Sequence, residues 1–294
     1  MRSFSVVIPA YNAESYLQEQ LEALLNNTVS IPEIIVSDNG STDSTKGIVE
    51  CYAQKYENIK YLYSGECRGV SYARNKAIRR VHSELILMCD ADDVVSKDWA
   101  EKLIRALDTA DLVGSGYGFY LFDEGMKQFT VTYHDCQQPK VFGDQPYCVA
   151  SSMGVTKAVF EAIGGFDESY RGGHEEVDFC LRLSAAGFTQ GWVSEPLISY
   201  RQRPSSRGIA RQSRNYGRTW VQLTANFSPE FDHHLPSLKL MVRKVLPAAP
   251  KYFRQRDKSW LEVRGFWWNF GVLEGLVRYR LLGKLPSRCL VDGK

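Results

Sequence analysis

Residues 85–93 read Leu-Ile-Leu-Met-Cys-Asp-Ala-Asp-Asp, an apolar run that passes directly into three carboxylates. A short continuous apolar run of this kind is typical of a buried strand. Three carboxylates within four residues repel one another unless a positive charge lies among them. Carboxylate oxygens are the ligands that Mg²⁺ and Mn²⁺ prefer. The stretch therefore predicts a buried strand that ends in a divalent-cation site. An acidic loop in which Asp93 or Ser96 caps the following helix is the alternative.

Apolar runs and helical spacings alternate around this stretch. Phe4–Ile8, Ile34–Val36 and Ile59–Tyr63 are short apolar runs that predict three further strands. Each of them is followed by apolar residues at helical spacing, and Trp99–Leu107 shows the same spacing after the acidic run. Alternating strands and helices with short connections predict an α/β fold, in which helices flank a mostly parallel central sheet.

Polar segments follow three of the predicted strands, at Pro9–Asn12, Asp38–Asp43 and Asp90–Asp93. In parallel sheets of this class, ligands bind beyond the carboxyl ends of the strands, so we expect the three segments to meet in space. Asp38 would accept a hydrogen bond from a nucleotide base, or would close a local Asx turn. Arg74, near the start of a predicted helix, is suited to phosphate.

Six motifs in this order resemble the successive signatures of family 2 glycosyltransferases, which are inverting enzymes with the GT-A fold. They are residues 6–12 (VVIPAYN), 36–43 (VSDNGSTD), 69–75 (GVSYARN), 90–93 (DADD), 164–168 (GGFDE) and 175–183 (EEVDFCLRL). The resemblance covers about residues 4–220. It implies a nucleotide-sugar-binding catalytic domain over residues 1–230, with a nucleotide-binding half at about 1–110 and an acceptor-binding half at about 111–230.

The resemblance also implies roles for individual residues. Asp92, together with Asp90, would bind a Mn²⁺ or Mg²⁺ ion that bridges the donor diphosphate. Glu176 would be the catalytic base, with Glu175 as the second candidate, although the family often has Asp at the position of Glu176. The donor nucleotide sugar would be bound by Pro9, Ala10, Tyr11, Asn12, Asp38, Gly69, Arg74, Asp90 and Ala91. Arg201 and Arg203 would close over the diphosphate or lie as ordinary surface charge. His174 would contact the acceptor or phosphate, or face solvent.

The implied activity is the transfer of a sugar, with inversion, from a UDP- or dTDP-linked donor to a hydroxyl of a glycan or lipid-linked sugar. Cell-surface polysaccharide or glycolipid biosynthesis is the expected setting. A catalytically inactive nucleotide-sugar-binding protein of the same fold is one alternative, because Glu replaces the usual Asp base. A sugar nucleotidyltransferase is another, but it would need a glycine-rich basic loop after the first strand. A dinucleotide dehydrogenase would need GxGxxG there, and Pro9–Asn12 provides neither loop.

Charge divides the chain into two parts. Residues 1–200 hold 17 Lys and Arg against 28 Asp and Glu, whereas residues 201–294 hold 19 against 6. The formal net charge of +2 therefore conceals a basic tail. Apolar residues at helical spacing between Leu238 and Leu246, with cations on the other faces, predict an amphipathic helix, so we assign residues 231–294 to a basic helical extension. Its aromatic residues and arginines suit an anionic membrane surface. Packing on the catalytic domain or in a homodimer is the alternative.

The remaining composition favours a cytoplasmic protein. The seven cysteines form no CxxC pair and are odd in number, which is typical of a reduced protein. The longest apolar stretches are too short to cross a bilayer, and residues 1–11 are too short for a signal peptide. We therefore expect a cytoplasmic location, peripheral on the inner face of the cell membrane if the tail binds lipid. Nucleic acid is not an expected partner, because the aromatic residues of the tail cluster with aliphatic ones.

Overall fold

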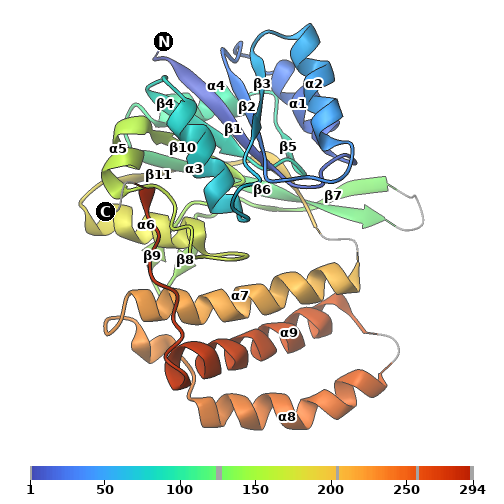
Figure 1. The fold of residues 1–294 in the computed structure, drawn as a ribbon, viewed down its shortest axis with the longest axis vertical. Helices are drawn as coiled ribbons and strands as arrows, with labels where there is room; N and C mark the ends of the chain where they lie inside the picture. Colours follow the sequence, from blue (N-terminus) through green and yellow to red (C-terminus); the bar gives the residue numbers. More distant parts are fainter. Residues whose placement is uncertain (1, 124–127, 203–204, 256–257, 292–294) are drawn as a thin grey trace. The chain divides into compact units, whose positions relative to one another are not determined.

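The computed structural model describes residues 2–123, 128–202, 205–255 and 258–291, with side chains described outside residues 119–134. The chain divides into two compact units (Figure 1). The first unit comprises Met1–Glu168, Glu176–Gln202 and Leu290–Lys294, and the second comprises Ser169–Glu175 and Arg203–Cys289. This division separates compact parts of the chain and does not define functional domains. The predicted boundary between catalytic domain and extension near residue 230 therefore stays a prediction.

A nine-stranded sheet forms the centre of the first unit. Its strands follow the order β3-β2-β1-β4-β10-β6-β11-β5, and β7 pairs with β6. The strands from β3 to β4 in this order are parallel, as predicted, and β11 is parallel to β6, whereas β10 lies antiparallel between β4 and β6. The bounds are β1 Phe4–Ala10, β2 Ile34–Asp38, β3 Ile59–Tyr63, β4 Leu85–Cys89, β5 Val94–Val95, β6 Leu112–Asp123, β7 Gln128–Asp135, β10 Ser152–Thr156 and β11 Gln190–Arg201. A separate hairpin pairs β8 Lys140–Val141 with β9 Gln145–Pro146.

Helices cover both faces of this sheet, so its inner strands are buried on two sides. Val6 and Ile8 of β1 join the core under α1, α2 and α4, whereas Val7 joins the core under α3, α5 and α6. Successive side chains of a strand point to opposite faces, which is why a strand buried on both faces reads as a continuous apolar run. The helices are α1 Leu17–Leu25, α2 Thr45–Lys55, α3 Val70–Arg80, α4 Trp99–Ala106, α5 Lys157–Ile163 and α6 Glu175–Ala185.

The strands between residues 110 and 200 are rich in glycine because other groups approach them closely. A Cβ added to Gly114 of β6 would lie 2.7 Å from the Trp192 ring, and one added to Gly116 would lie 2.8 Å from the backbone oxygen of Glu195. Real Cβ atoms do not make such contacts, so a side chain at either position would separate β6 from β11. These glycines also remove the apolar pattern by which a strand is recognised.

The second unit consists of helices, in agreement with the predicted helical extension. It contains α7 Ser206–Asn226, a 3-10 turn Asp232–His234, α8 Leu238–Arg254, α9 Trp260–Gly275 and a π-helical turn Leu276–Leu281. Ser205, Ser237 and Ser259 cap α7, α8 and α9, because each hydroxyl accepts a backbone N–H of the first turn. Its core joins Val221, Met241, Val245, Val272 and Leu276. None of the described helices is both long and apolar enough to span a bilayer.

Candidate functional site

The first two polar segments meet beyond the ends of β1 and β2, as the sequence predicts. Ala10 is the register partner of Asp38 in the parallel pair. The side-chain oxygen of Asn12 accepts the N–H of Thr42 at 2.8 Å, and the N–H of Asn12 donates to Ser41 Oγ at 2.9 Å. These reciprocal bonds join the Pro9–Asn12 segment to the turn after β2.

Within the Pro9–Asn12 segment, the four residues differ in exposure. Pro9 is half-buried and Ala10 is buried, whereas the Tyr11 side chain is 54% exposed. Asn12 has a φ of 49°, a left-handed conformation that Asn adopts more readily than most residues. The segment therefore turns out of the sheet at Tyr11, which leaves its ring available for stacking.

Asp38 lies at the carboxyl end of β2 and is 2% exposed. Its Oδ1 accepts the N–H of Ser41 at 2.8 Å, which closes a local turn one residue longer than the Asx turn offered as the alternative. Its Oδ2 accepts the Tyr61 hydroxyl at 2.9 Å. Burial, followed by the hydrogen bond to Asp38, raises the pKa of Tyr61 well above its usual value, so this tyrosine keeps its proton. A carboxylate offers about four acceptor positions, so Asp38 retains capacity for a further donor.

Asn39 connects the turn after β2 to the start of α3. Its Nδ2 donates to the backbone oxygens of Ser64 and Cys67 at 2.6 and 2.9 Å, and its Oδ1 accepts the N–H of Gly69 at 2.8 Å. Gly69 precedes α3 with a φ of 138°, a conformation that favours glycine. The predicted donor residue Gly69 is therefore the N-cap of α3.

Arg74 lies one turn into α3 and is 2% exposed. Its Nη2 donates to Asp90 Oδ1 at 2.7 Å, and its guanidinium lies 5.6 Å from the centroid of the Phe166 ring. A buried guanidinium in contact with the acidic loop provides the positive charge that the clustered carboxylates need. Arg74 and Asp90, both predicted donor-site residues, are therefore in direct contact.

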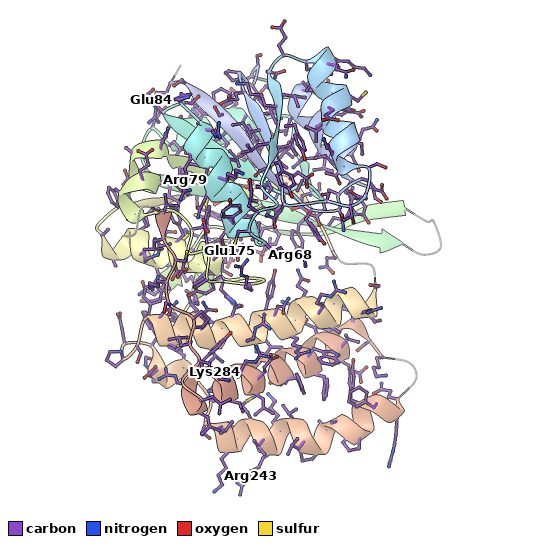
Figure 2. All side chains as sticks on the ribbon, in the orientation of Figure 1. Arg68, Arg79, Glu84, Glu175, Arg243 and Lys284 are labelled. Carbon is purple, nitrogen blue, oxygen red and sulfur yellow. The ribbon has the colours of Figure 1, made fainter. Side chains whose placement is uncertain are left out.

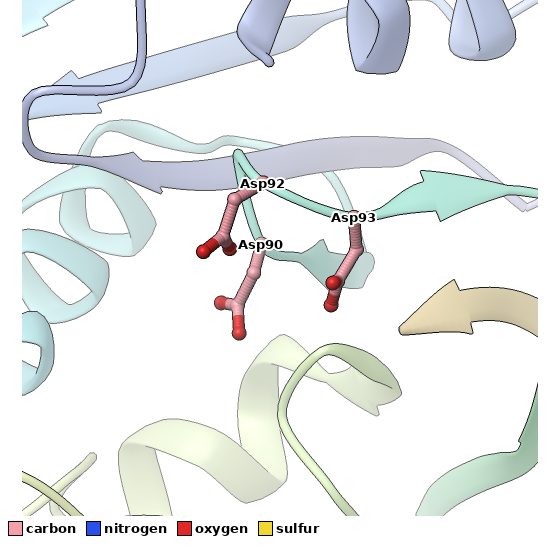
Figure 3. A group of neighbouring side chains, drawn as sticks. All are labelled: Asp90, Asp92 and Asp93. Carbon is pink, nitrogen blue, oxygen red and sulfur yellow. The ribbon is translucent and has the colours of Figure 1, made fainter. Parts of the chain in front are cut away.

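The acidic triad, Asp90, Asp92 and Asp93, projects from the loop between β4 and β5 toward one side (Figure 3). One carboxylate oxygen from each residue lies within 4.8 Å of the others. Opposite ligands of an octahedral Mg²⁺ ion lie about 4.2 Å apart at ligand distances of about 2.1 Å. The observed spread is slightly wider than this, so the carboxylates would close by a few tenths of an ångström around an ion, and their all-oxygen donor set suits a hard divalent cation. Asp93 is added to the predicted pair, and Ala91 is buried between them.

Arg201, at the end of β11, holds this loop from the opposite side. Its N–H donates to Asp93 Oδ1 at 2.8 Å, and its Nη1 donates to the backbone oxygen of Asp92 at 3.0 Å. Its Nη2 bonds Glu19 at 2.6 Å, and its guanidinium lies over the Tyr16 ring at 4.6 Å. Arg201 is only 5% exposed, so the structure does not place it as ordinary surface charge. Arg203 lies outside the described residues.

The two candidate bases stand in the first turn of α6. Glu176 is half-buried and belongs to the first unit, as the acidic triad does, whereas Glu175 is 6% exposed and belongs to the second. Burial and then the charge of Glu176 raise the pKa of Tyr147, so this tyrosine keeps its proton. Two residues after Glu176, Asp178 accepts Nε of Arg182, one turn further along the helix, at 2.7 Å. The helix therefore carries one partly accessible carboxylate in its first turn.

His174 precedes these residues; the structure contradicts the solvent-facing alternative for it, and the alternative of acceptor or phosphate contact stays a prediction. Its Nδ1 lies 2.8 Å from Thr219 Oγ1, and its ring packs against Tyr216, Trp220 and Trp268. Burial lowers the pKa of His174 to about 4, so the ring is neutral at pH 7. Its role in this unit is to pack and to form a hydrogen bond.

Three residues that support the site have no signal in the sequence. Tyr61 bonds Asp38, and the pKa of Tyr147 is raised by burial and by the charge of Glu176. Gln20 donates to the backbone oxygen of Asp90 at 2.9 Å and accepts the N–H of Val95 at 3.1 Å. The partners of Gln20 lie 70 and 75 residues away, so only the fold reveals these contacts.

The model of the family "Glycosyl transferase family 2" matches residues 5–164, more than half of the chain. The chain belongs to glycosyl transferase family 2. A second model, "Glycosyl transferase family group 2", matches residues 85–282 of this family member. The resemblance carried by the six motifs is thereby confirmed.

Curated relatives share this membership. The chain is 35% identical over 140 residues to the putative glycosyltransferase EpsH of Bacillus subtilis, which covers 46% of this chain and 40% of EpsH. It is 33% identical to the glycosyltransferase GlyG of Streptococcus pneumoniae over 45% of this chain and 44% of GlyG. The chain thus spans less than half the length of these two relatives. It is 29% identical to the putative teichuronic acid biosynthesis glycosyltransferase TuaG of Bacillus subtilis, over 67% of this chain and 78% of TuaG.

Solved structures share the fold of this family 2 member. The mannosyltransferase PcManGT from Pyrobaculum calidifontis, in complex with GDP-Man and Mn²⁺, superposes with a TM-score of 0.57 at 16% identity, covering 97% of this chain and 77% of that one. S. aureus TarS 1-349 in complex with UDP gives a TM-score of 0.53 at 19% identity, covering 100% and 95%. The predicted α/β fold of GT-A type, with helices after it, is confirmed.

Proposed function

We propose that this chain transfers a sugar, with inversion, from a UDP- or dTDP-linked donor to a hydroxyl of a glycan or lipid-linked acceptor. The observation that carries the proposal is the acidic triad, set beside Arg74 at the same sheet edge as Asp38, in a member of glycosyl transferase family 2. The name of TuaG, with teichuronic acid biosynthesis in it, supports cell-surface polysaccharide synthesis as the setting. The UDP complex of TarS supports a uridine donor.

The donor base would lie over the ends of β1 and β2. Asp38 accepts a ring N–H there, and uracil and thymine present the same ring N–H to it. Tyr61 and Ser41 hold both oxygens of Asp38 in place, so little reorganisation accompanies binding. The exposed Tyr11 ring stacks on the base.

The donor diphosphate would lie at the acidic triad. Asp90, Asp92 and Asp93 would hold Mn²⁺ or Mg²⁺, and when bound there such an ion offsets the charge of the departing diphosphate. Arg74 and Arg201 fix the loop by contacts with Asp90 and with Asp92 and Asp93. The carboxylates are therefore oriented before the donor arrives.

The acceptor hydroxyl would give its proton to Glu176. The first turn of a helix stabilises a negative charge, so the N-terminus of α6 favours the ionised carboxylate that a base requires. The acceptor oxygen then attacks the anomeric carbon on the face opposite the diphosphate, and the configuration inverts in a single displacement. Glu175 is the alternative base if Glu176→Gln retains activity.

The test measures Mn²⁺-dependent UDP binding and sugar transfer separately, over a panel of nucleotide sugars and acceptors. Glu176→Gln should retain UDP binding and lose transfer by about 100-fold or more, the usual contribution of a general base. Asp92→Asn should lose both sugar transfer and Mn²⁺-dependent UDP binding. Glu57→Gln, at an exposed loop position, is the control. Wild-type turnover by Asp92→Asn and Glu176→Gln would reject the assignment, and donor binding without transfer by the wild type would identify an inactive sugar-nucleotide binder.

Docking of α8 on an anionic membrane is part of the same proposal. Leu240, Leu246 and Phe253 of this helix are 56%, 60% and 66% exposed, and basic side chains such as Arg243 accompany them. Apolar groups beside cations favour the interface of an anionic bilayer. Such docking would make the protein peripheral on the inner face of the cell membrane. Co-sedimentation with phosphatidylglycerol vesicles, but not with phosphatidylcholine vesicles, is the expected result, and Leu246→Ser/Phe253→Ser should lose it. A dimer that forms without lipid through the same face would refute the membrane assignment.

A further inference from the structure

A cavity of about 670 Å³ lies within the second unit. Its wall comes from Ser169 and Arg171, from α7, and from the chain between Arg278 and Pro286. Four of its lining residues are cationic, namely Arg171, Arg218, Arg278 and Lys284, and no carboxylate is among the lining residues that the structure describes. We call this cavity the basic pocket. Lys284 is labelled in Figure 2.

Glu274 partly neutralises this charge from behind the wall. Glu274, with a side chain 10% exposed, lies 3.1 Å from Arg278 Nε and 3.8 Å from Arg218 Nη1, and it also bonds Arg214 at 2.8 Å. Three guanidinium groups thus share one negative charge. Lys284 is exposed, and among the described residues its ammonium has no hydrogen-bond or ion-pair partner. The basic pocket therefore keeps an excess of positive charge.

The cationic groups are also held in position. Arg218 Nη2 donates to the backbone oxygen of Arg171 at 3.0 Å and to Asn215 Oδ1 at 3.2 Å, which fixes its guanidinium plane. Gln222 Nε2 donates to Ser169 Oγ at 2.9 Å, so two neutral polar groups are ordered in the same wall. Burial raises the pKa of Tyr279, which leaves its hydroxyl as a further donor.

Phosphate and diphosphate esters match these properties. Guanidinium groups bind phosphate oxygens with two parallel N–H bonds, and an ammonium adds a point charge. A diphosphate carries enough charge to engage several cations at once. The pocket volume is within the range of small-molecule sites and exceeds that of a phosphate alone, and Leu282 and Pro286 add apolar wall. The rest of the esterified molecule therefore enters with the charged group.

We propose that the basic pocket binds a phosphate or diphosphate group carried by the glycan acceptor, a step that rests on the proposed transferase function. Arg171 of the pocket precedes Glu175 by four residues, so their Cα atoms lie at most about 14 Å apart. Glu176 follows directly. A phosphate in the pocket would thus be held within the same unit as Glu175, the second candidate base, which favours the acceptor as its source and leaves the donor diphosphate to the acidic triad.

Calorimetry with inorganic pyrophosphate tests the site without requiring transfer. The full chain is titrated in EDTA, so that pyrophosphate cannot enter the triad as a metal complex. Arg278→Gln/Lys284→Gln should weaken binding by about tenfold or more, since we expect the two exposed cations together to contribute about 1.5–3 kcal/mol, and 1.4 kcal/mol is tenfold. Arg79→Gln/Arg80→Gln removes the same charge from exposed positions of α3 and should bind like the wild type. Arg79 is labelled in Figure 2.

Two results would overturn the anion site itself: no pyrophosphate binding by the wild type, or equal losses in the pocket and α3 variants. Lys284→Gln alone is the variant expected to keep the fold, because among the described residues this side chain has no partner to lose. It should still weaken pyrophosphate binding several-fold. Two competition experiments identify the source of the phosphate. If soluble glycerol phosphate oligomers displace pyrophosphate, the source is a phosphorylated glycan. If polyprenyl diphosphate in nanodiscs displaces it, the source is a lipid-linked acceptor. Competition by neither overturns the acceptor assignment. Absence of transfer with pyrophosphate binding intact would reject the proposed function and leave the anion site.

Discussion

Two glycines in the same helix, α9, should respond in opposite ways to the same substitution. Gly271 lies against α7, and a Cβ added to it would lie 2.0 Å from the backbone oxygen of Arg214. Gly265 is exposed, and a Cβ added to it would meet no atom within 4 Å. The substitutions are Gly271→Ala and Gly265→Ala. Because the chemical change and the helix are identical, the difference between the two variants isolates the helix contact.

The magnitude follows from two terms. Replacing Gly by Ala in a helix interior stabilises the folded state by about 1 kcal/mol, and this gain is common to both variants. Relieving a 2.0 Å contact to van der Waals distance requires the two backbones to separate by more than about 1 Å. Overpacking of this kind costs about 1–3 kcal/mol, and we expect the upper end because the opposing atom is backbone and cannot rotate away. Gly271→Ala should therefore lose about 2 kcal/mol of unfolding free energy, and Gly265→Ala should gain about 1 kcal/mol.

Urea unfolding followed by tryptophan fluorescence measures both values. Four tryptophans report on the second unit, at positions 220, 260, 267 and 268. The midpoint of this transition should fall for Gly271→Ala and rise for Gly265→Ala, with similar slopes. Gly217→Ala repeats the test from the other helix, since its Cβ would lie 2.1 Å from the backbone oxygen of Trp268. Equal stabilities of Gly271→Ala and Gly265→Ala would refute the close contact between α7 and α9.

Two further predictions concern single side chains. The pKa of His174 is lowered by burial to about 4, against an unfolded value near 6.5, so the unfolded chain binds one more proton between these values. The contribution of His174 to stability should therefore be constant above about pH 6.5 and fall by up to about 3 kcal/mol as the pH drops to 4, and His174→Gln should reduce the loss by that amount in urea titrations. Tyr61→Phe removes the hydroxyl that donates to the buried Asp38, so it should lower the unfolding free energy by about 1–2 kcal/mol; a measured loss below 0.3 kcal/mol, on the order of experimental error, would show that solvent replaces this bond.

The N-terminal strands were predictable because burial on both faces leaves a local signature. β3 was predicted at its observed bounds, and β1, β2 and β4 extend the predicted runs by one or two residues at their ends. β10 had no such signature. Its five residues include a serine and a glycine, and it exists because it inserts between β4 and β6, which lie far away in the sequence. A strand defined by its neighbours cannot be read from its own residues.

The site shows the same division between local and distant causes. Segments after strand ends were predictable to converge, because parallel neighbours end at one edge, and Ala10 beside Asp38 confirms this for the first two. The burial of His174 was not predictable, since it depends on aromatic rings of α7 and α9 more than 40 residues away. The basic pocket was hidden for the same reason, because its cations come from three separate segments.

The acidic triad illustrates how a correct expectation can rest on an incomplete cause. From the sequence, repulsion among three carboxylates calls for a bound cation. In the structure, Arg74 already pairs with Asp90, and the N–H of Arg201 already bonds Asp93, so the protein itself offsets much of that repulsion. The case for a metal therefore depends on geometry: oxygen atoms from all three residues converge within 4.8 Å. Because these two arginines stabilise the loop without a metal, removing Mn²⁺ should abolish donor binding while leaving the fold intact. Unfolding upon chelation would instead show that the ion, and not the arginines, holds the loop.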